Sequence, residues 1–238
     1  MKNQKCNFKL AFTLAEVLIT LGIIGVVAAI TIPVLISNYQ KKQLETQIKA
    51  TYSTIQQTLR YAEDEDISYS TVADGNSKFL KEWFYNFLAK HMKVGQVCVD
   101  RVPKGCWHQI YNLGGSKVGD SEGIGSGIIS FNIVKGSSFM LDGYLAEHMM
   151  SLFGIDTDES GLVFFFDANG KTKPNVIGKD VFVMAWTEKG LVPAGYSKSK
   201  AEIDDNCYNG SAYFCLNKVI ENDWKIPDKV WRRKIKYK

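Results

Sequence analysis

The feature that most constrains this chain is a run of apolar residues near its start that carries one acid. From Phe12 to Ile36 the only charged side chain is that of Glu16. As an α-helix this run would be about 37 Å long at about 1.5 Å per residue, whereas the hydrocarbon core of a bilayer is about 30 Å thick. A charged side chain inside a membrane costs roughly 2.5–3.5 kcal/mol on insertion scales, so such a residue is by default a functional candidate. The run therefore predicts a membrane span in which Glu16 has a role.

Three interpretations of this run compete. An ordinary secretory signal would be cut after small residues, here near Ala28 and Ala29, but its apolar core is normally only about 7–15 residues long. A plain membrane anchor would make Glu16 an incidental acid near the interface. The third interpretation rests on the string Lys9-Leu10-Ala11-Phe12-Thr13-Leu14-Ala15-Glu16-Val17-Leu18.

This string resembles the class III prepilin signal of type IV pilins and type II secretion pseudopilins. The resemblance implies that prepilin peptidase cuts between Ala11 and Phe12 on the cytoplasmic side and methylates the new amine of Phe12. Glu16 would then be the fifth residue of the mature chain. The family usually has glycine before the cut, where this chain has Ala11. Gly25 and Pro33 stand where the family often has glycine and proline.

The physical chemistry of a membrane agrees with a role for Glu16 in assembly. Cleavage would give Phe12 a free α-amine, whose unperturbed pKa is about 7.7–8.0, and methylation would keep its charge. A buried ammonium and a buried carboxylate are each costly alone and much less so as a pair. The resemblance implies that this pair, formed between neighbouring subunits, sets the register of the filament.

The helix is expected to continue beyond the membrane. Pro33 removes one backbone hydrogen bond, so we expect a kink or local melting there. Beyond it, apolar residues recur at helical spacing: Leu44, Ile48, Tyr52, Ile55, Leu59 and Ala62. We therefore divide the chain into a leader (1–11), a transmembrane half-helix (12–36), an amphipathic half-helix (37–62), a globular head (63–228) and a basic tail (229–238).

The head is expected to contain a second helix and then mostly strands. The helix, Ser77 to Met92, would bury Phe79, Leu80, Trp83, Phe84, Phe87 and Leu88. Strands are expected at 137–141, before an Asp142-Gly143 turn and a further segment at 144–153, and then at 161–166, 181–186 and 191–193, with a short helix at 211–222. The fold class is α+β: a long N-terminal helix packed on a small antiparallel sheet of three to five strands, as in pilins.

The cysteines indicate the compartment of the head. Cys6 lies in the leader and would be lost, which leaves Cys98, Cys106, Cys207 and Cys215. An even set in two close pairs suggests disulfides formed outside the cytoplasm. Three connectivities are open, and we favour Cys98–Cys106 with Cys207–Cys215 because both short loops contain turn formers. Four free thiols are the alternative, and a zinc site at Cys98, Cys106 and His108 matches no common spacing.

Site chemistry in the head is sparse. Asp167, Asn169 and Asp180 are oxygen ligands that could bind calcium, which takes about 6–8 oxygens. Their spacing is not that of an EF-hand, and the other interpretation is a turn in which Asp167 and Asn169 bond local backbone groups. The three histidines sit in no recognisable catalytic arrangement, and the glycine-rich stretch 114–127 lacks the Gly-Lys-Ser/Thr of a phosphate loop. We therefore do not expect an enzyme.

The sequence thus predicts a structural subunit of a type II secretion or type IV pilus-like filament. Its expected partners are prepilin peptidase, an inner-membrane assembly platform and other pilin-like subunits, and its place is the bacterial inner membrane with an extracytoplasmic head. The alternative is a minor pilin whose head binds DNA, a surface or a secreted substrate. Loss of the leader would remove Lys2, Lys5 and Lys9 and lower the net charge from +4 to about +1 (26 basic minus 25 acidic residues), which does not decide for or against nucleic acid. The basic tail, from Lys229 to Lys238, is expected either to be solvated or to contact an anionic partner.

Overall fold

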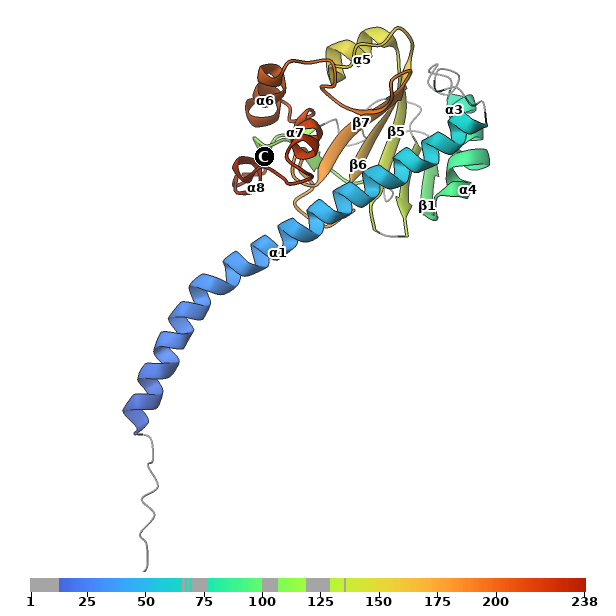
Figure 1. The fold of residues 1–238 in the computed structure, drawn as a ribbon. Coiled ribbons are helices and arrows are strands. Elements are labelled where there is room, and N and C mark those ends of the chain that lie inside the picture. The colour runs from blue at the N-terminus through green and yellow to red at the C-terminus, as the bar shows by residue number, and fades with distance from the viewer. Residues whose placement is uncertain are drawn as a thin grey trace, which may run out of the picture. The chain divides into compact units, whose positions relative to one another are not determined.

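The chain folds as α+β, with one long N-terminal helix and an antiparallel sheet (Figure 1). The computed structural model describes residues 13–65, 67, 69, 77–99, 107–118, 129–134 and 136–238. The chain divides into two compact units, Met1–Lys41 and Lys42–Lys238. The expected fold class is therefore confirmed at the level of α+β.

The long helix α1 (Leu14–Asp64) has parts in both units. It continues through Pro33, so the local melting that we allowed for does not occur. In the second unit Tyr52 is half-buried, and its hydroxyl donates to the carbonyl of Leu191 at 2.9 Å. The predicted stripe is otherwise buried, with two threonines added to it: Leu44, Ile48, Thr51, Ile55, Thr58, Leu59 and Ala62.

The main sheet has six strands, one more than the upper limit that we expected. Its order is β1-β4-β5-β6-β7-β8, and every neighbouring pair is antiparallel. The strands are β1 (Val94–Val99), β4 (Ile129–Ile133), β5 (Ser138–Tyr144), β6 (Gly161–Asp167), β7 (Val181–Thr187) and β8 (Gly190–Pro193). A separate pair, β2 (Ile110–Tyr111) and β3 (Lys117–Val118), lies outside this sheet.

The core of the second unit lies at the central strands. Every residue of β6 and β7 is buried, which explains their continuous apolar composition. Within this unit, α1 crosses one face of the sheet, and a group of short helices lies beside β7 (Figure 1). The predicted hairpin of β7 and β8 is confirmed, with Thr187 paired to Gly190 across the turn.

The second predicted helix is present but contains a π-helical turn. It consists of α3 (Ser77–Trp83), η1 (Phe84–Leu88) and α4 (Ala89–His91). Trp83, Phe84 and Phe87 are buried as expected, together with Leu80 and Leu88. Phe79 was expected in the buried face, but 46% of it is exposed.

The prediction of a turn at Asp142-Gly143 is wrong. β5 runs straight through both residues, which pair with Val163 and Leu162 of β6. The chain reverses instead through helix α5 (Ala146–Phe153), which ends at Gly154 with a left-handed φ of 63°. A strand-like segment was expected at 144–153, where α5 stands. At Asp142 and Gly143, cross-strand pairing with β6 outweighs the local turn signal.

Three short helices complete the second unit. The sequence prediction missed α6 (Lys200–Asn209), although Ser199 and Glu202 form a capping box at its start. The helix expected at 211–222 is the shorter α7 (Cys215–Glu221), and Ala212 before it has φ 67°. The last is α8 (Asp228–Trp231).

Candidate functional site

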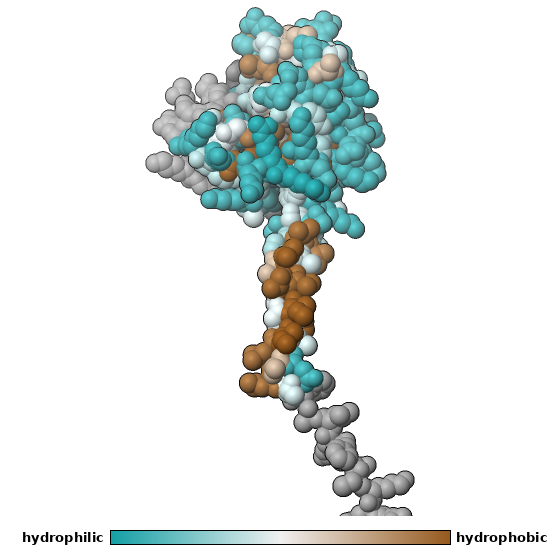
Figure 2. Space-filling view, turned by 90° about the vertical axis from the view of Figure 1, so that its left-hand side faces the viewer, coloured by the Kyte–Doolittle hydropathy of each residue, from teal (hydrophilic) through white to brown (hydrophobic). Residues whose placement is uncertain are grey.

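The first unit presents an apolar helical surface that no other described residue of that unit covers. Figure 2 shows this run as a nearly continuous hydrophobic surface. Among the described residues, α1 is the one helix long and apolar enough to cross a membrane. An exposed apolar surface of this size marks a membrane or protein contact. Its large side chains include Leu14, Leu18, Ile19, Leu21, Ile23, Ile24, Val26, Ile30 and Leu35.

The hydroxyl groups within this apolar run are bonded inside their own helix. Thr20 Oγ1 donates to the carbonyl of Val17 at 2.9 Å, and Thr31 Oγ1 donates to the carbonyl of Val27 at 2.9 Å. In hydrocarbon an unsatisfied polar group would cost several kcal/mol, so such internal bonds suit a helix surrounded by lipid.

Glu16 forms a capping box with Thr13 at the start of α1. One carboxylate oxygen accepts from the Thr13 backbone N–H at 2.8 Å and from the Thr13 hydroxyl at 2.8 Å. The Glu16 backbone N–H donates in return to the Thr13 hydroxyl at 3.2 Å. The acid therefore satisfies donors at the end of its own helix, where negative charge also suits the helix dipole.

The sequence prediction for Glu16 omitted this cap, although the pattern Thr13-x-x-Glu16 was readable. The cleavage residues Ala11 and Phe12 lie outside the described residues. The proposed cut and methylation therefore stay predictions.

A second polar cluster lies inside the head, around two buried acids. Asp167 ends β6 and Asp180 precedes β7, and neither has any exposed surface. Nε2 of His108 and one oxygen of Asp167 are 2.8 Å apart. The other Asp167 oxygen accepts from the backbone N–H of Asn169 at 3.1 Å. The sequence prediction missed His108 as a partner of Asp167 because 59 residues separate them.

Asp180 holds the loop that precedes it. Its two oxygens accept from the backbone N–H of Asn175 at 2.8 Å and of Val176 at 2.6 Å. Its own carbonyl accepts from Ala168 N–H at 2.9 Å, which joins the two ends of the segment between β6 and β7. Asn175 has a left-handed φ of 53°, a conformation that asparagine adopts more readily than most other residues except glycine.

Burial dominates the electrostatics of this cluster. It raises the pKa of Asp167 well above its usual range, and burial followed by the charge of Asp167 raises the pKa of Asp180 to about 7. Burial also lowers the pKa of His108 to about 4. His108 is therefore neutral near pH 7.

The carboxylate oxygens that the sequence suggested for calcium already have partners, whereas Oδ1 of Asn169 is buried without one among the described residues. Each oxygen of Asp167 and Asp180 already faces a described N–H donor or the His108 ring. Within the described ranges, no group of three or more His, Cys, Asp or Glu side chains is arranged to hold a metal. Calcium prefers a shell of about 6–8 oxygens. Calcium binding by Asp167, Asn169 and Asp180 stays an untested prediction, and the arrangement serves to hold two loops together.

The predicted disulfide between Cys207 and Cys215 is present and joins α6 to the first residue of α7. Both cysteines are fully buried. Cys98 lies half-buried on β1, and its predicted partner Cys106 lies outside the described residues.

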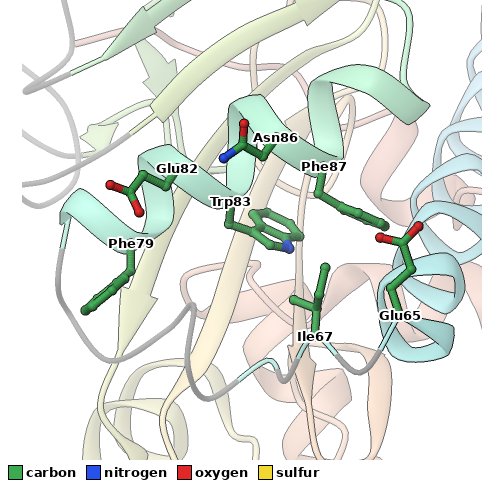
Figure 3. Close-up of a pocket in the computed structure, with 7 residues that line it drawn as sticks. All are labelled: Glu65, Ile67, Phe79, Glu82, Trp83, Asn86 and Phe87. Carbon is green, nitrogen blue, oxygen red and sulfur yellow. The ribbon is translucent and has the colours of Figure 1, made fainter.

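An open hollow lies where the end of α1 meets the second helix (Figure 3). The indole of Trp83 lines it, and Trp83 Nε1 is buried without a hydrogen-bond partner among the described residues. The segment 70–76, which leads into α3, lies outside the described residues, so we assign no ligand to this hollow. Its lining residues are Glu65, Ile67, Phe79, Glu82, Trp83, Asn86 and Phe87.

Comparison of the chain with protein-family models, with characterised proteins and with solved structures finds no match.

Proposed function

We propose that the chain is a pilin-like filament subunit of a type II secretion or type IV pilus-like system. In this proposal prepilin peptidase cuts between Ala11 and Phe12 and methylates Phe12. An inner-membrane assembly platform then packs the apolar half of α1 against other pilin-like subunits. The head is extracytoplasmic, which agrees with the Cys207–Cys215 disulfide.

The observation that carries the proposal is the position of Glu16 on α1. It lies in the first turn of an exposed apolar helix, where its carboxylate is held at the helix end by Thr13. A span with no role for the acid would be cheaper to insert without it, because a charged side chain in hydrocarbon is costly. The need for a helix cap does not by itself explain the acid. A Ser, Thr, Asn or Asp at the cap position can cap a helix without an acid at position 16.

The capping role and the proposed intersubunit role of Glu16 can be separated by substitution. Glu16→Gln keeps a side-chain oxygen for Thr13 but removes the charge. We expect this variant to insert and to be processed, but to enter filaments about tenfold less or worse, because it leaves a neighbour's ammonium unpaired in the membrane. Pelleting of sheared filaments, with N-terminal sequencing of the mature chain, measures both steps.

The matched control is Thr13→Val, which removes the hydroxyl of the cap and keeps the Glu16 charge. It should weaken the helix end by about 0.5–2 kcal/mol and leave incorporation near normal. Normal incorporation of Glu16→Gln, or a mature chain that starts near Ile30 rather than at methylated Phe12, would contradict the proposal.

A further inference from the structure

The basic end of the chain is packed against the head and is not free in solvent. Val230 of α8 is buried, and Ile235 packs against the core. The ammonium of Lys179, a residue only 8% exposed, donates to the carbonyl of Trp231 at 2.9 Å and to that of Arg233 at 2.6 Å. A buried ammonium needs such acceptors, so the tail and Lys179 stabilise each other's positions.

The last residues of the tail are held at a second place. The Tyr237 hydroxyl donates to the carbonyl of Pro174 at 2.9 Å, and the backbone N–H of Lys238 donates to the carbonyl of Gly115 at 3.0 Å. Gly115 has φ +84°, and a Cβ there would overlap the carbonyl oxygen of Lys236, so the tail can come this close only to a glycine. The tail is therefore docked from α8 to its last residue.

One part of the surface that receives the tail is the residue next to a buried cysteine. Cys207 lies in α6, and Tyr208 follows it directly. Nη1 of Arg233 donates to the carbonyl of Tyr208 at 2.7 Å, and the ammonium of Lys229 lies 4.4 Å from the centre of the Tyr208 ring. A hydrogen bond and a cation–π contact thus bind the tail to the helical turn that carries Cys207.

The other part of this surface is the turn that carries Lys179, and it touches Cys215. Gly178 precedes Lys179 and has φ +88°. Its backbone N–H donates to the carbonyl of Val181 at 2.9 Å, which closes the turn. A Cβ on Gly178 would lie only 2.8 Å from Sγ of Cys215. The start of α7 therefore packs directly against the backbone that positions the ammonium of Lys179.

The disulfide between Cys207 and Cys215 joins these two parts. Both cysteines are fully buried, and the bond ties α6 to the first residue of α7. Between them Ala212 has a left-handed φ of 67°, which a residue other than glycine keeps only where its surroundings impose it. The bond is one such constraint, and it fixes the spacing of Tyr208 and Lys179.

Reduction would disturb this arrangement at both contacts. A dithiol supplies two electrons and two protons, becomes a cyclic disulfide itself and leaves two thiols on the protein. The two sulfurs must then move apart to non-bonded contact, roughly 3.5–4 Å. Gly178 already lies against Sγ of Cys215, so this movement displaces the turn of Lys179, the helix of Tyr208, or both.

We propose that the tail docks on the head only while Cys207 and Cys215 are joined, so that their disulfide is a redox switch for the tail. In a reducing compartment the tail is released, and in an oxidising compartment it is closed onto Lys179 and Tyr208. The strands β4, β5 and β6 are held by their own pairing and do not take part. This switch does not depend on the filament function proposed above.

The test follows amide hydrogen exchange of the full chain in neutral detergent micelles by mass spectrometry, before and after reduction with dithiothreitol. In the oxidised chain the tail should be protected, because the backbone N–H groups of Val230, Arg233 and Lys238 are hydrogen-bonded. Reduction should speed exchange in the tail by about tenfold or more and leave β5 and β6 unchanged. Alkylation of Cys207 and Cys215, located by peptide mass, verifies the reduction.

Two cysteine variants make the assignment specific. Cys98→Ser with Cys106→Ser removes the other predicted pair, and it should behave like the unchanged chain in both redox states. Cys207→Ser with Cys215→Ser takes the place of reduction where the buried bond resists the reductant, and it should expose the tail in the same way.

A lysine variant separates the tail from the disulfide. Lys179→Met keeps the bond but removes the donors that hold the tail. Its oxidised form should exchange the tail amides as fast as the reduced unchanged chain does, and reduction should add little. Lys200→Met, which changes an exposed lysine of α6, is the matched control and should keep the tail protected.

Either of two results would overturn the proposal. The first is equal protection of the tail with and without the disulfide. The second is loss of protection in β5 and β6 as large as that in the tail, or a serine pair that does not fold, because the bond would then stabilise the whole head and not the docking of the tail.

Discussion

Asp142 shows how a single buried acid ties the stability of the head to pH. It lies on β5 with 9% of its surface exposed, and burial raises the pKa of its carboxyl to about 7 from an ordinary value of 3.8. Between these values the folded chain keeps a proton that the unfolded chain has released. The contribution of Asp142 to stability is therefore present at low pH and is lost as pH rises from about 4 to about 7.

Replacement of Asp142 by Asn should remove this dependence. The amide stays neutral at every pH. The free energy of unfolding of Asp142→Asn should therefore rise relative to that of the unchanged chain as pH rises, by on the order of 4 kcal/mol once the pH is above about 7. Denaturant unfolding at about pH 5 and about pH 8 measures the free energy of unfolding of both chains. The difference between the chains is free of the opposite pH trend from His108, because both chains contain that residue. The control is Asp158→Asn, which replaces an exposed acid. An equal pH trend in both variants would contradict the role given to Asp142.

Single residues could be read from the sequence where their partners are local. Glu16 and Thr13 are three residues apart, and their spacing alone is that of a capping box. His108 and Asp167 are 59 residues apart, and only the packing of β6 brings them together. Lys179 is similar, because its acceptors lie on a tail whose composition suggested solvent.

At the scale of elements, the stripe on α1 was the most reliable signal, because burial of one helix face sets both its spacing and its position. Ile55 lies in the middle of this face and has no exposed surface. Ile55→Ala should lower the free energy of unfolding by about 2–5 kcal/mol, through lost burial and a cavity against the sheet. Thermal denaturation measures it, with Gln57→Ala on the exposed face as control. A shift no larger than that of the control would mean that this face does not pack on the sheet.

Elements with weaker local signals were misjudged for identifiable reasons. Asp142-Gly143 has the composition of a turn, yet both residues are held in β5 by pairing with Val163 and Leu162. The strand β4 was missed because it follows the glycine-rich stretch. By contrast α6 could have been found, since Ser199 and Glu202 stand at capping-box spacing.

At the scale of the whole molecule, the apolar half of α1 makes membrane attachment testable without any partner. Gly25 lies in the middle of the apolar run with open space around it, so a larger side chain meets no steric obstacle within the chain. Gly25→Arg should cost roughly 2.5–3.5 kcal/mol on insertion and shift the protein from the membrane to the soluble or degraded fraction. Carbonate extraction and flotation of cell membranes measure this.

The control for that substitution is Gln40→Arg, which places the same charge beyond the apolar run. It should remain in the membrane fraction. Retention of Gly25→Arg to the same degree would show that this part of α1 does not lie in hydrocarbon.

The docking of the tail onto Lys179 changes how the end of this chain should be manipulated. Truncation after Asp228 would strip away the carbonyls of Trp231 and Arg233 and leave an ammonium inside the protein without acceptors. A deletion mutant would then report a damaged head, whatever else the tail does. Lys238 is tied to the head as well, because its backbone N–H donates to the carbonyl of Gly115 at 3.0 Å. Point substitutions of exposed tail lysines keep the contacts of the tail backbone with the head, whereas truncation removes them.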